Sequence, residues 1–539
     1  MQKREERNYS ILMWFIIFIS MMIAVLFCIQ KQGFHYDENY SYYSTNVTYG
    51  LFPTENEWKD VKEIRSEFMV NPGETLNLGM VKLSQSYDVH PPLYYYVLRV
   101  VCFLTKNTYS KWQGLFVNLV FYFLCLILLW KITKLAGNDN KLINAFSIAL
   151  FGLSPGYLST VTFIRMYVML TFFCFAVLLV AMKAFRNNLW TWKGCFIPTA
   201  VLCCLGFLTH YYFIIFVFFV AAFTCLYLVF HKETRVKAFI YGGSVCVGLL
   251  AAVAYYPVCL SHIFSGYRGT EATQAFADIS NTGDRISFFV QLVNDFTFSG
   301  AFYVLVLIGL LLYMFYSFKK NTRKVPAKTE DFPGSVNGTV KKTVRPEMLL
   351  LIVVTAGYFL LVCKTGMMPS NPAEALRYAS PSYGLIIVLV VCGLVTVLEE
   401  LGAKKIIAAV ILSVAVICQI FGLMNNKVFF IYKDSVNNYE WAEQHKENDI
   451  AFIYNPNNAW MIWNDSPELM KYSDIYFIPM TDENDITDDR LSNSSSVFVY
   501  ACRCDESEQI MQRMIDANSK LNSFEKIEER LYVDIYELK

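Results

Sequence analysis

Apolar residues along this chain come in long continuous blocks and not in the stripes of an amphipathic surface helix. Four such blocks occupy residues 11–29, 115–130, 143–158 and 302–318. Each approaches the ~20 residues that a helix needs to cross ~30 Å of hydrocarbon, where a helix also satisfies its own backbone hydrogen bonds. The pattern therefore predicts a polytopic α-helical membrane protein.

The composition supports this class. Of 539 residues, 55% are apolar, 16% are aromatic and only 17% are charged, which leaves too little polar surface to cover a soluble protein of this size. The net charge of +1 says nothing about nucleic acid, and we expect no nucleic-acid partner. We therefore expect a multi-pass protein of the cell membrane, in contact with membrane lipids.

Positive charge predicts the orientation of the spans. Lys3, Arg4 and Arg7 precede the first block, and no small-residue cleavage site follows it, so we expect a retained helix with its N-terminus inside. The apolar run 93–104 carries Arg99 and is shorter than the ~17 residues of a minimal span. If this run lies flat on the outer interface, the basic clusters at 131–134, 183–186, 232–237 and 319–345 all become cytoplasmic.

This assignment gives about eleven transmembrane helices, the last of which ends near residue 423. We expect a membrane domain over residues 1–424, with a first outer loop at 30–113 that contains flat amphipathic segments at 58–69 and 93–104. Residues 425–539 then lie outside. Strand-like runs at 450–454, 475–478 and 497–501 and a helical pattern at 507–518 predict a small extracytoplasmic α/β domain there.

Two carboxylates stand just beyond the first span. Asp37 and Glu38 are surrounded by aromatic residues at a low-dielectric boundary, where partial desolvation raises the basicity of a carboxylate. Such groups are suited to take a proton from an acceptor hydroxyl. The alternative is a solvated pair at a helix end, and position alone does not decide between the two.

The second motif is the run from Asp88 through His90, Pro91 and Pro92 to Tyr95. The prolines end one segment and begin a helix, so they hold Asp88 and His90 at its entrance. Either side chain has the chemistry to bind a metal ion, orient a phosphate or cap the helix, and capping is the simplest reading for Asp88.

Three further ionisable residues lie at outer helix ends, namely Arg165, His210 and Arg377, and two of them are followed closely by Tyr167 and Tyr378. An ionisable group within a membrane costs ~2.5 to 3.5 kcal/mol on insertion scales, which favours a functional reading. A single arginine of this kind is also an ordinary interfacial anchor. Two guanidiniums and an imidazole on one face form a suitable cradle for a phosphate.

The order of these motifs resembles that of the protein O-mannosyltransferase-like enzymes of glycosyltransferase family 39. These belong to the membrane GT-C superfamily, which includes the aminoarabinose transferase of lipid A. The resemblance covers roughly residues 8–400 and is strongest at Asp37-Glu38 and His90-Pro91-Pro92.

The resemblance implies a GT-C fold and an inverting transfer of a sugar, a hexose or a pentose, from a polyprenyl-phosphate donor. The acceptor would be an envelope polymer, a lipid or a protein on the extracytoplasmic side. Asp37 matches the catalytic carboxylate, with Glu38 beside it, and His90 stands where the aminoarabinose branch has a lysine that contacts the donor phosphate. This departure leaves Asp88 and His90 as candidate ligands of a divalent metal ion, the only cofactor that we consider.

Two other classes of function remain open from the sequence. A flippase or transporter of lipid-linked sugars also carries ionisable groups in its membrane part, but usually near the bilayer midplane and with repeat symmetry. A noncatalytic membrane scaffold is the other alternative. The candidate charges here gather at one face, and no repeat is visible.

Overall fold

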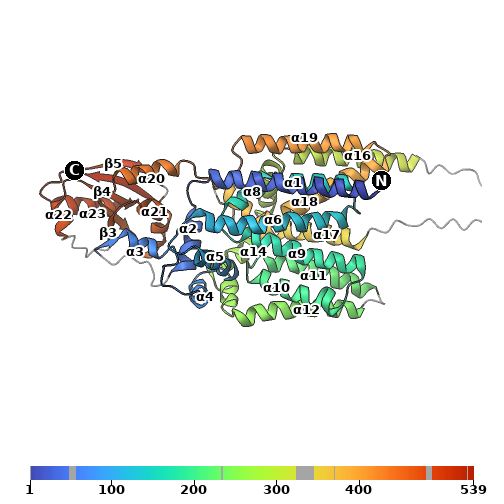
Figure 1. Ribbon diagram of the computed structural model, residues 1–539, viewed down its shortest axis with the longest axis horizontal. Coiled ribbons are helices and arrows are strands. Elements are labelled where there is room, and N and C mark those ends of the chain that lie inside the picture. Colours follow the sequence, from blue (N-terminus) through green and yellow to red (C-terminus); the bar gives the residue numbers. More distant parts are fainter. Residues whose placement is uncertain are drawn as a thin grey trace, which may run out of the picture.

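A computed structural model describes residues 2–47, 56–231, 235–322, 345–369, 371–480, 488–530 and 532–539. The chain forms a long helical bundle with a smaller sheet-containing part at one end, and the chain termini lie toward opposite ends of the molecule (Figure 1). The polytopic helical class expected from the sequence is confirmed.

Nine helices of the described residues are long and apolar enough to cross a membrane. They are α1 (Gln2–Gln30), α6 (Lys111–Ala136), α9 (Tyr167–Asn187), α11 (Phe213–Phe230), α12 (Arg235–Tyr255), α16 (Phe302–Thr322), α17 (Pro346–Thr365), α18 (Pro372–Glu400) and α19 (Lys405–Met424). Helix α9 is the most central of them, because 78% of its most apolar stretch is buried. Helix α16 lies at the edge of the bundle, where 6% of the corresponding stretch is buried.

Two further apolar segments are irregular. Helices α7 (Lys141–Gly152) and α8 (Pro155–Thr162) form one path with a bend of 51° between them. The bend is explained by Ser154, whose hydroxyl caps α8, and by Pro155 in the first turn, which cannot donate a backbone bond to α7. The π-turn η1 (Trp192–Phe196) and α10 (Ile197–Phe207) form a shorter apolar helix. The bent path and this helix would complete the expected eleven spans, a number that stays a prediction.

Basic residues gather at the end of the bundle that lies away from the sheet. Arg345 donates hydrogen bonds to the last carbonyls of α6, at Leu135 and Ala136, and Arg186 at the end of α9 pairs with Glu347 at 3.0 Å. The N-terminus lies at this same end (Figure 1). Residues 232–234 and 323–344 of the expected basic clusters fall outside the described residues.

At the opposite end, short helices form a layer between the bundle and the sheet (Figure 1). From the first loop they are α2 (Tyr36–Asn46), α4 (Leu78–Ser86) and α5 (Leu93–Leu104), while α3 (Val61–Ser66) lies beside the sheet (Figure 1). From later loops they are α13 (Cys259–Phe264), α14 (Tyr267–Ala277), α15 (Thr282–Leu292) and the π-turn η3 (Val293–Thr297). Helix α5 spans the apolar run expected to lie on the interface, and that placement stays a prediction because no membrane is part of the structure.

The terminal part contains a six-stranded sheet of order β1-β3-β2-β4-β6-β5. Its strands are β1 (Glu57–Asp60), β2 (Asp449–Tyr454), β3 (Asp474–Pro479), β4 (Val497–Cys502), β5 (Phe524–Glu529) and β6 (Val533–Leu538). Strand β2 pairs in parallel with β3 and β4, and the other neighbours are antiparallel. The three strands expected in this part are confirmed, as β2, β3 and β4.

Strand β1 corrects one expectation. It comes from the loop that follows α1, and Trp58 lies opposite Tyr476 of β3. The sequence predicts a flat amphipathic segment at 58–69, but the first residues of this segment complete the edge of the distant sheet, and only 61–66 are helical. An edge strand offers unpaired backbone groups, and β1 satisfies those of β3.

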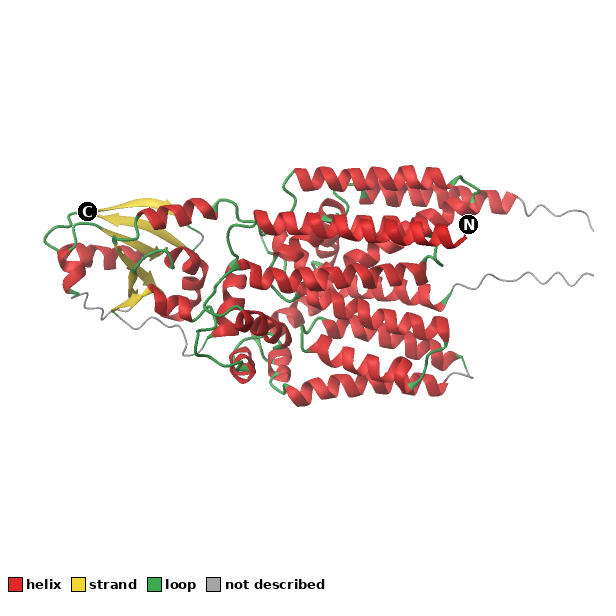
Figure 2. Cartoon of the chain, viewed as in Figure 1, coloured by secondary structure: helices red, strands yellow, loops and turns green. Residues whose placement is uncertain are grey.

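Helices cover both faces of the sheet (Figure 2). They are α20 (Ser435–Gln444), the 3₁₀ turn η4 (Pro456–Met461), α21 (Ile462–Leu469), α22 (Asp489–Asn493) and α23 (Asp505–Asp516). Along β2, Phe452 belongs to the apolar cluster that is continuous with the bundle, whereas Ala451 and Ile453 belong to a separate cluster that includes Ile510 of α23. Because successive residues of a strand point to opposite faces, one face of the sheet packs against the apolar core that continues into the bundle.

Candidate active site

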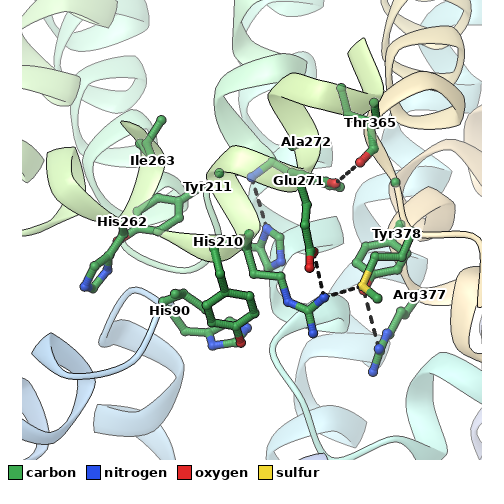
Figure 3. Close-up of a pocket in the computed structure, with 18 of the residues that line it drawn as sticks. His90, His210, Tyr211, His262, Ile263, Glu271, Ala272, Thr365, Arg377 and Tyr378 are labelled. Carbon is green, nitrogen blue, oxygen red and sulfur yellow. Dashed lines mark hydrogen bonds and ion pairs between the residues drawn. The ribbon is translucent and has the colours of Figure 1, made fainter. Parts of the chain in front are cut away.

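A cavity of about 1170 Å³ lies where the bundle, the short helices and the terminal part meet. Its walls come from α2, from the turns before α5, α9 and α11, from α14, and from the segment that leads into α18. Of the nine residues proposed from the sequence, eight line it: Asp37, Asp88, His90, Arg165, Tyr167, His210, Arg377 and Tyr378. The close-up shows His90, His210, Arg377 and Tyr378 around one space (Figure 3).

Asp37 stands in the first turn of α2, where the helix dipole favours a negative charge. Its carboxylate accepts a 2.6 Å hydrogen bond from Arg377. Burial alone would raise the pKa of Asp37, but the guanidiniums of Arg165 and Arg377 outweigh this effect and hold the pKa well below its usual range. Asp37 is therefore ionised in the resting site, and only 22% of its side chain is exposed.

Arg165 lies in the turn between α8 and α9 and is 2% exposed. One nitrogen of its guanidinium donates to the Asp37 carbonyl at 3.3 Å, to the Ser41 hydroxyl at 3.1 Å and to the Tyr95 hydroxyl at 3.0 Å. The other donates to His90 at 3.1 Å. Most of the donor fork of Arg165 is thus engaged by the protein, which fixes the Asp37 turn against the α8–α9 turn.

His90 connects this arginine to Asp88. Its Nε2 faces the Arg165 guanidinium, which can only donate, so Nε2 accepts this hydrogen bond. Its Nδ1 is 2.6 Å from the Asp88 carboxylate and donates to it. Burial would raise the pKa of Asp88, but the contact with His90 and the charge of Arg165 lower it below the usual value.

This arrangement does not fit a divalent metal ion at Asp88 and His90. The Nε2 lone pair that would bind the metal already accepts from a guanidinium, and a metal ion there would lie next to that positive charge. The described part of the chain contains no group of three or more His, Cys, Asp or Glu side chains arranged to hold a metal.

Glu38 differs from the other candidates because it is absent from the cavity wall. It is fully buried, and its carboxylate accepts from Lys31 at 2.9 Å, from the backbone N–H of His35 at 2.6 Å and from that of Ile164 at 2.7 Å. The last of these contacts reaches the residue before Arg165. Glu38 is thus engaged in joining two backbone turns.

Aromatic rings surround the charged groups. The Arg377 guanidinium lies 5.3 Å from the ring centroid of Phe163, 5.9 Å from that of Tyr167 and 5.2 Å from that of Tyr378. The ring of His210 lies 5.4 Å from Tyr167, and burial lowers the pKa of His210, so this imidazole is neutral. Cation–π contacts of this kind hold a cation without neutralising it.

The cavity also contains residues that the sequence reasoning missed. Arg268 and Glu271 of α14 pair at 3.0 Å on its wall, and 40% of the Arg268 side chain is exposed. Trp463 and Tyr532 reach the cavity from the terminal part. No motif marked Arg268, and the resemblance did not extend to the terminal part, so only the cavity reveals all four.

Comparisons with known proteins agree with the fold and the family expectation. A family model described as dolichyl-phosphate-mannose-protein mannosyltransferase matches residues 89–258. This segment includes His90, Arg165 and His210 but neither Asp37 nor Arg377. No curated protein sequence matches the chain.

Among solved structures, ArnT from Cupriavidus metallidurans bound to undecaprenyl phosphate is 10% identical, with a TM-score of 0.51 and coverage of 97% of each chain. The same protein in the apo state is 9% identical, with a TM-score of 0.52 and coverage of 99% of this chain and 98% of that one. The Archaeoglobus fulgidus oligosaccharyltransferase is 12% identical, covering 90% of this chain and 68% of that one, with a TM-score of 0.43. The chain therefore shares the overall fold of ArnT, and its residues 89–258 are similar to the dolichyl-phosphate-mannose-protein mannosyltransferase family.

Proposed function

We propose that this protein is an inverting glycosyltransferase that moves a sugar from a polyprenyl-phosphate donor to an acceptor on the extracytoplasmic side of the membrane. The observation that carries the proposal is the ion pair between Asp37 and Arg377 on the wall of a large cavity at one end of the bundle. It brings together a carboxylate base and a cation suited to phosphate, which are the two groups that this chemistry needs.

The reaction breaks one bond and forms another at the anomeric carbon. The acceptor hydroxyl oxygen attacks this carbon from the face opposite the phosphate, its proton passes to Asp37, and polyprenyl phosphate leaves with the bonding electrons. Glycosyl transfer passes through an oxocarbenium-like transition state, in which negative charge grows on the departing phosphate. Cations near the phosphate oxygen that leaves the sugar stabilise the transition state more than the ground state.

The ion pair also suggests how the base becomes active. While Arg377 donates to Asp37, the pKa of the carboxylate is low and the carboxylate is a weak base. A donor phosphate competes for the same guanidinium. Its attraction to Arg377 grows as the bond to the sugar breaks, because negative charge then builds up on the phosphate. Asp37 gains basicity as Arg377 turns toward the phosphate, in step with the release of the acceptor proton.

The other cations of the cavity wall have different contacts and therefore different tasks in this proposal. The Arg268 side chain is more exposed to the cavity than that of Arg165 or Arg377. We assign the donor phosphate to Arg268 and Arg377. Arg165 adds positive charge, but its donors serve Asp37, Ser41, Tyr95 and His90, so its main task is to hold the Asp37 turn. His210, Tyr167 and Tyr378 complete the donor side.

The acceptor approaches from the terminal part in this proposal. Trp463 and Tyr532 line the cavity together with Tyr36 and Tyr40 of α2, on the side of Asp37. Aromatic rings with polar edges suit an acceptor that has both apolar and hydrated parts, such as an envelope polymer, a lipid or a protein segment.

The proposed boundary between the two domains follows α19. It divides the chain into a membrane domain at 1–424 and an extracytoplasmic domain at 425–539.

One assay separates this function from the alternatives. Purified protein in liposomes is incubated with a panel of radiolabelled polyprenyl-phosphate hexoses and pentoses and with an envelope extract as the acceptor source. We expect release of polyprenyl phosphate and label in the extract, with at least one donor. Movement of the label across the bilayer without release would indicate a flippase, and neither event a scaffold; both outcomes contradict the proposal.

A further inference from the structure

Phe430 lies in the linker between α19 and α20 with an unusual backbone conformation. Its φ is 62°, in the left-handed region, and its side chain is 6% exposed. This region is unfavourable for a large L-residue because its Cβ approaches a backbone oxygen, and such residues persist only where their surroundings hold them. The contacts of Phe430 should therefore explain why the chain adopts this turn.

The carbonyl of Phe430 accepts a 2.6 Å hydrogen bond from the ammonium of Lys31. Lys31 and its ion-pair partner Glu38 are both fully buried. Because Glu38 follows Asp37 and binds the N–H of Ile164, this chain of contacts leads from the linker to both turns of the site. A buried ion pair needs such additional hydrogen bonds to be favourable.

The ring of Phe430 reaches the other half of the site. It stacks on Phe163 with centroids 4.2 Å apart and planes at 24°. The Arg377 guanidinium lies over the Phe163 ring as well, at 5.3 Å. Phe430, Phe163 and Arg377 thus form a continuous contact from the linker to the partner of Asp37.

The rest of the linker is fastened to the same elements. Phe429 accepts from the Thr162 hydroxyl at 2.9 Å, and its N–H donates to Ser159 at 2.9 Å, both on α8. Ile431 accepts at 2.8 Å from the N–H of Gln32, just after α1. The linker is therefore held by hydrogen bonds to α8 and to the end of α1.

We propose that Phe430 is a positioning residue for the transfer reaction, which keeps the Asp37 carboxylate and the Arg377 guanidinium in register through its carbonyl and its ring. This inference rests on the proposed function. In the left-handed turn both groups of Phe430 reach the site, since the carbonyl contacts Lys31 while the ring contacts Phe163. The linker to the terminal part then forms part of the active-site support.

The test compares Phe430→Leu with Phe498→Leu, a matched control. Phe498 is 5% exposed and packs on Trp441 and His445 in the terminal part, away from the site. We expect Phe430→Leu to lower kcat by roughly 10-fold or more, because small misplacements of reacting groups are costly. Its acid limb in the pH profile should shift upward, since a displaced Arg377 no longer holds Asp37 ionised. Equal kcat and an equal acid limb in the two variants would overturn the proposal.

A second measurement keeps the inference separate from the proposed function. Thermal unfolding of Phe430→Leu, Arg377→Gln and the double variant forms a double-mutant cycle that needs no activity. We expect the combined loss in Tm to be smaller than the sum of the single losses, and the same cycle with Phe498→Leu to be additive. Additivity in both cycles overturns the positioning role, whereas a wild-type protein without transfer activity overturns only the function. Phe430→Met, whose unbranched side chain fills irregular space more readily than leucine, replaces Phe430→Leu if the latter does not fold.

Discussion

The carboxylate of Asp37 and the guanidinium of Arg377 meet at 2.6 Å, although 340 residues separate them in the chain. The contact joins α2, which follows the first span, to α18 of the bundle, and it defines where base and phosphate must lie in the proposed reaction. Its strength has two effects, since it keeps Asp37 ionised and also restrains its basicity until a phosphate competes for Arg377. The first predictions follow from this pair.

Replacement of Asp37 by Asn should remove the base while conserving the shape of the side chain. We expect transfer to fall by ~10² to 10⁴, the usual contribution of a positioned acid or base, with much less change in donor binding. Release of labelled polyprenyl phosphate measures the first and equilibrium binding of undecaprenyl phosphate the second. Asp139→Asn is the control, because Asp139 is 72% exposed and lies next to Lys134 in the turn after α6, away from the cavity. Normal transfer by Asp37→Asn, at equal amounts of folded protein, would show that another group accepts the proton.

Arg377→Lys should weaken donor binding even though the charge remains. Lysine lacks the planar fork that contacts a carboxylate and a phosphate together, and it stacks less well on the rings of Tyr167 and Tyr378. We expect a higher KM for the donor and a lower affinity for undecaprenyl phosphate. Arg490→Lys in the terminal part is a matched control, because Arg490 pairs with Asp449 and Asp474 outside the cavity. Equal donor affinity in wild type and Arg377→Lys contradicts this role.

Arg377→Gln should change the pH dependence of transfer. In the wild type, Arg165 and Arg377 hold the pKa of Asp37 below its usual range, so the carboxylate protonates only in strong acid. Without Arg377, burial is opposed by fewer charges and the pKa rises. The acid limb of kcat/KM, which reports the free enzyme, should therefore move to higher pH. An acid limb that stays in place or moves to lower pH would separate Arg377 from the titration of Asp37.

Asp465 provides a prediction on stability in the terminal part. Burial, followed by the charge of Glu468, raises its pKa from 3.8 to about 7. Because an acid with a raised pKa resists ionisation in the folded state, stability is greatest below the unfolded pKa and is lost as pH rises toward 7. The loss is at most about 4 kcal/mol, at about 1.4 kcal/mol for each pH unit.

Asp465→Asn should therefore raise the Tm at pH 8 relative to the wild type and have a smaller effect at pH 5. Thermal unfolding in detergent at the two values measures this, with Asp516→Asn as an exposed control in the same part of the chain. A Tm gain that is equal at both values, or larger at pH 5, contradicts the titration of Asp465.

The orientation can be tested by labelling cysteines in intact cells. Lys320→Cys lies at the end of α16 next to the basic segment, and Glu506→Cys lies in α23 of the terminal part. We expect a membrane-impermeant maleimide to label Glu506→Cys in intact cells and Lys320→Cys only after permeabilisation, each above the wild-type background. The reverse pattern would invert the topology and place the cavity in the cytoplasm.

The sequence by itself determined the membrane class, the central strands and most of the candidate residues. These signals are local, because an apolar block of about one membrane thickness or a short apolar strand reports its own environment. The motif order also singled out Asp37, His90, Arg165 and Arg377, all of which line one cavity. Glu38 shared the signal of Asp37, but adjacent residues in a helix point to different sides, and only packing separated the two.

The tertiary structure alone decided the contacts between distant segments. Strand β1 joins a sheet whose other strands begin almost 400 residues later, and the short segment Glu57–Asp60 has no alternation that would announce this pairing. Arg268, Trp463 and Tyr532 carry no motif and enter the cavity because their elements pack there. The left-handed turn at Phe430 depends on a buried ion pair and a stacked ring from other segments. Such features arise from the packing of whole elements, in which each residue's partners lie far along the chain, so no local pattern encodes them.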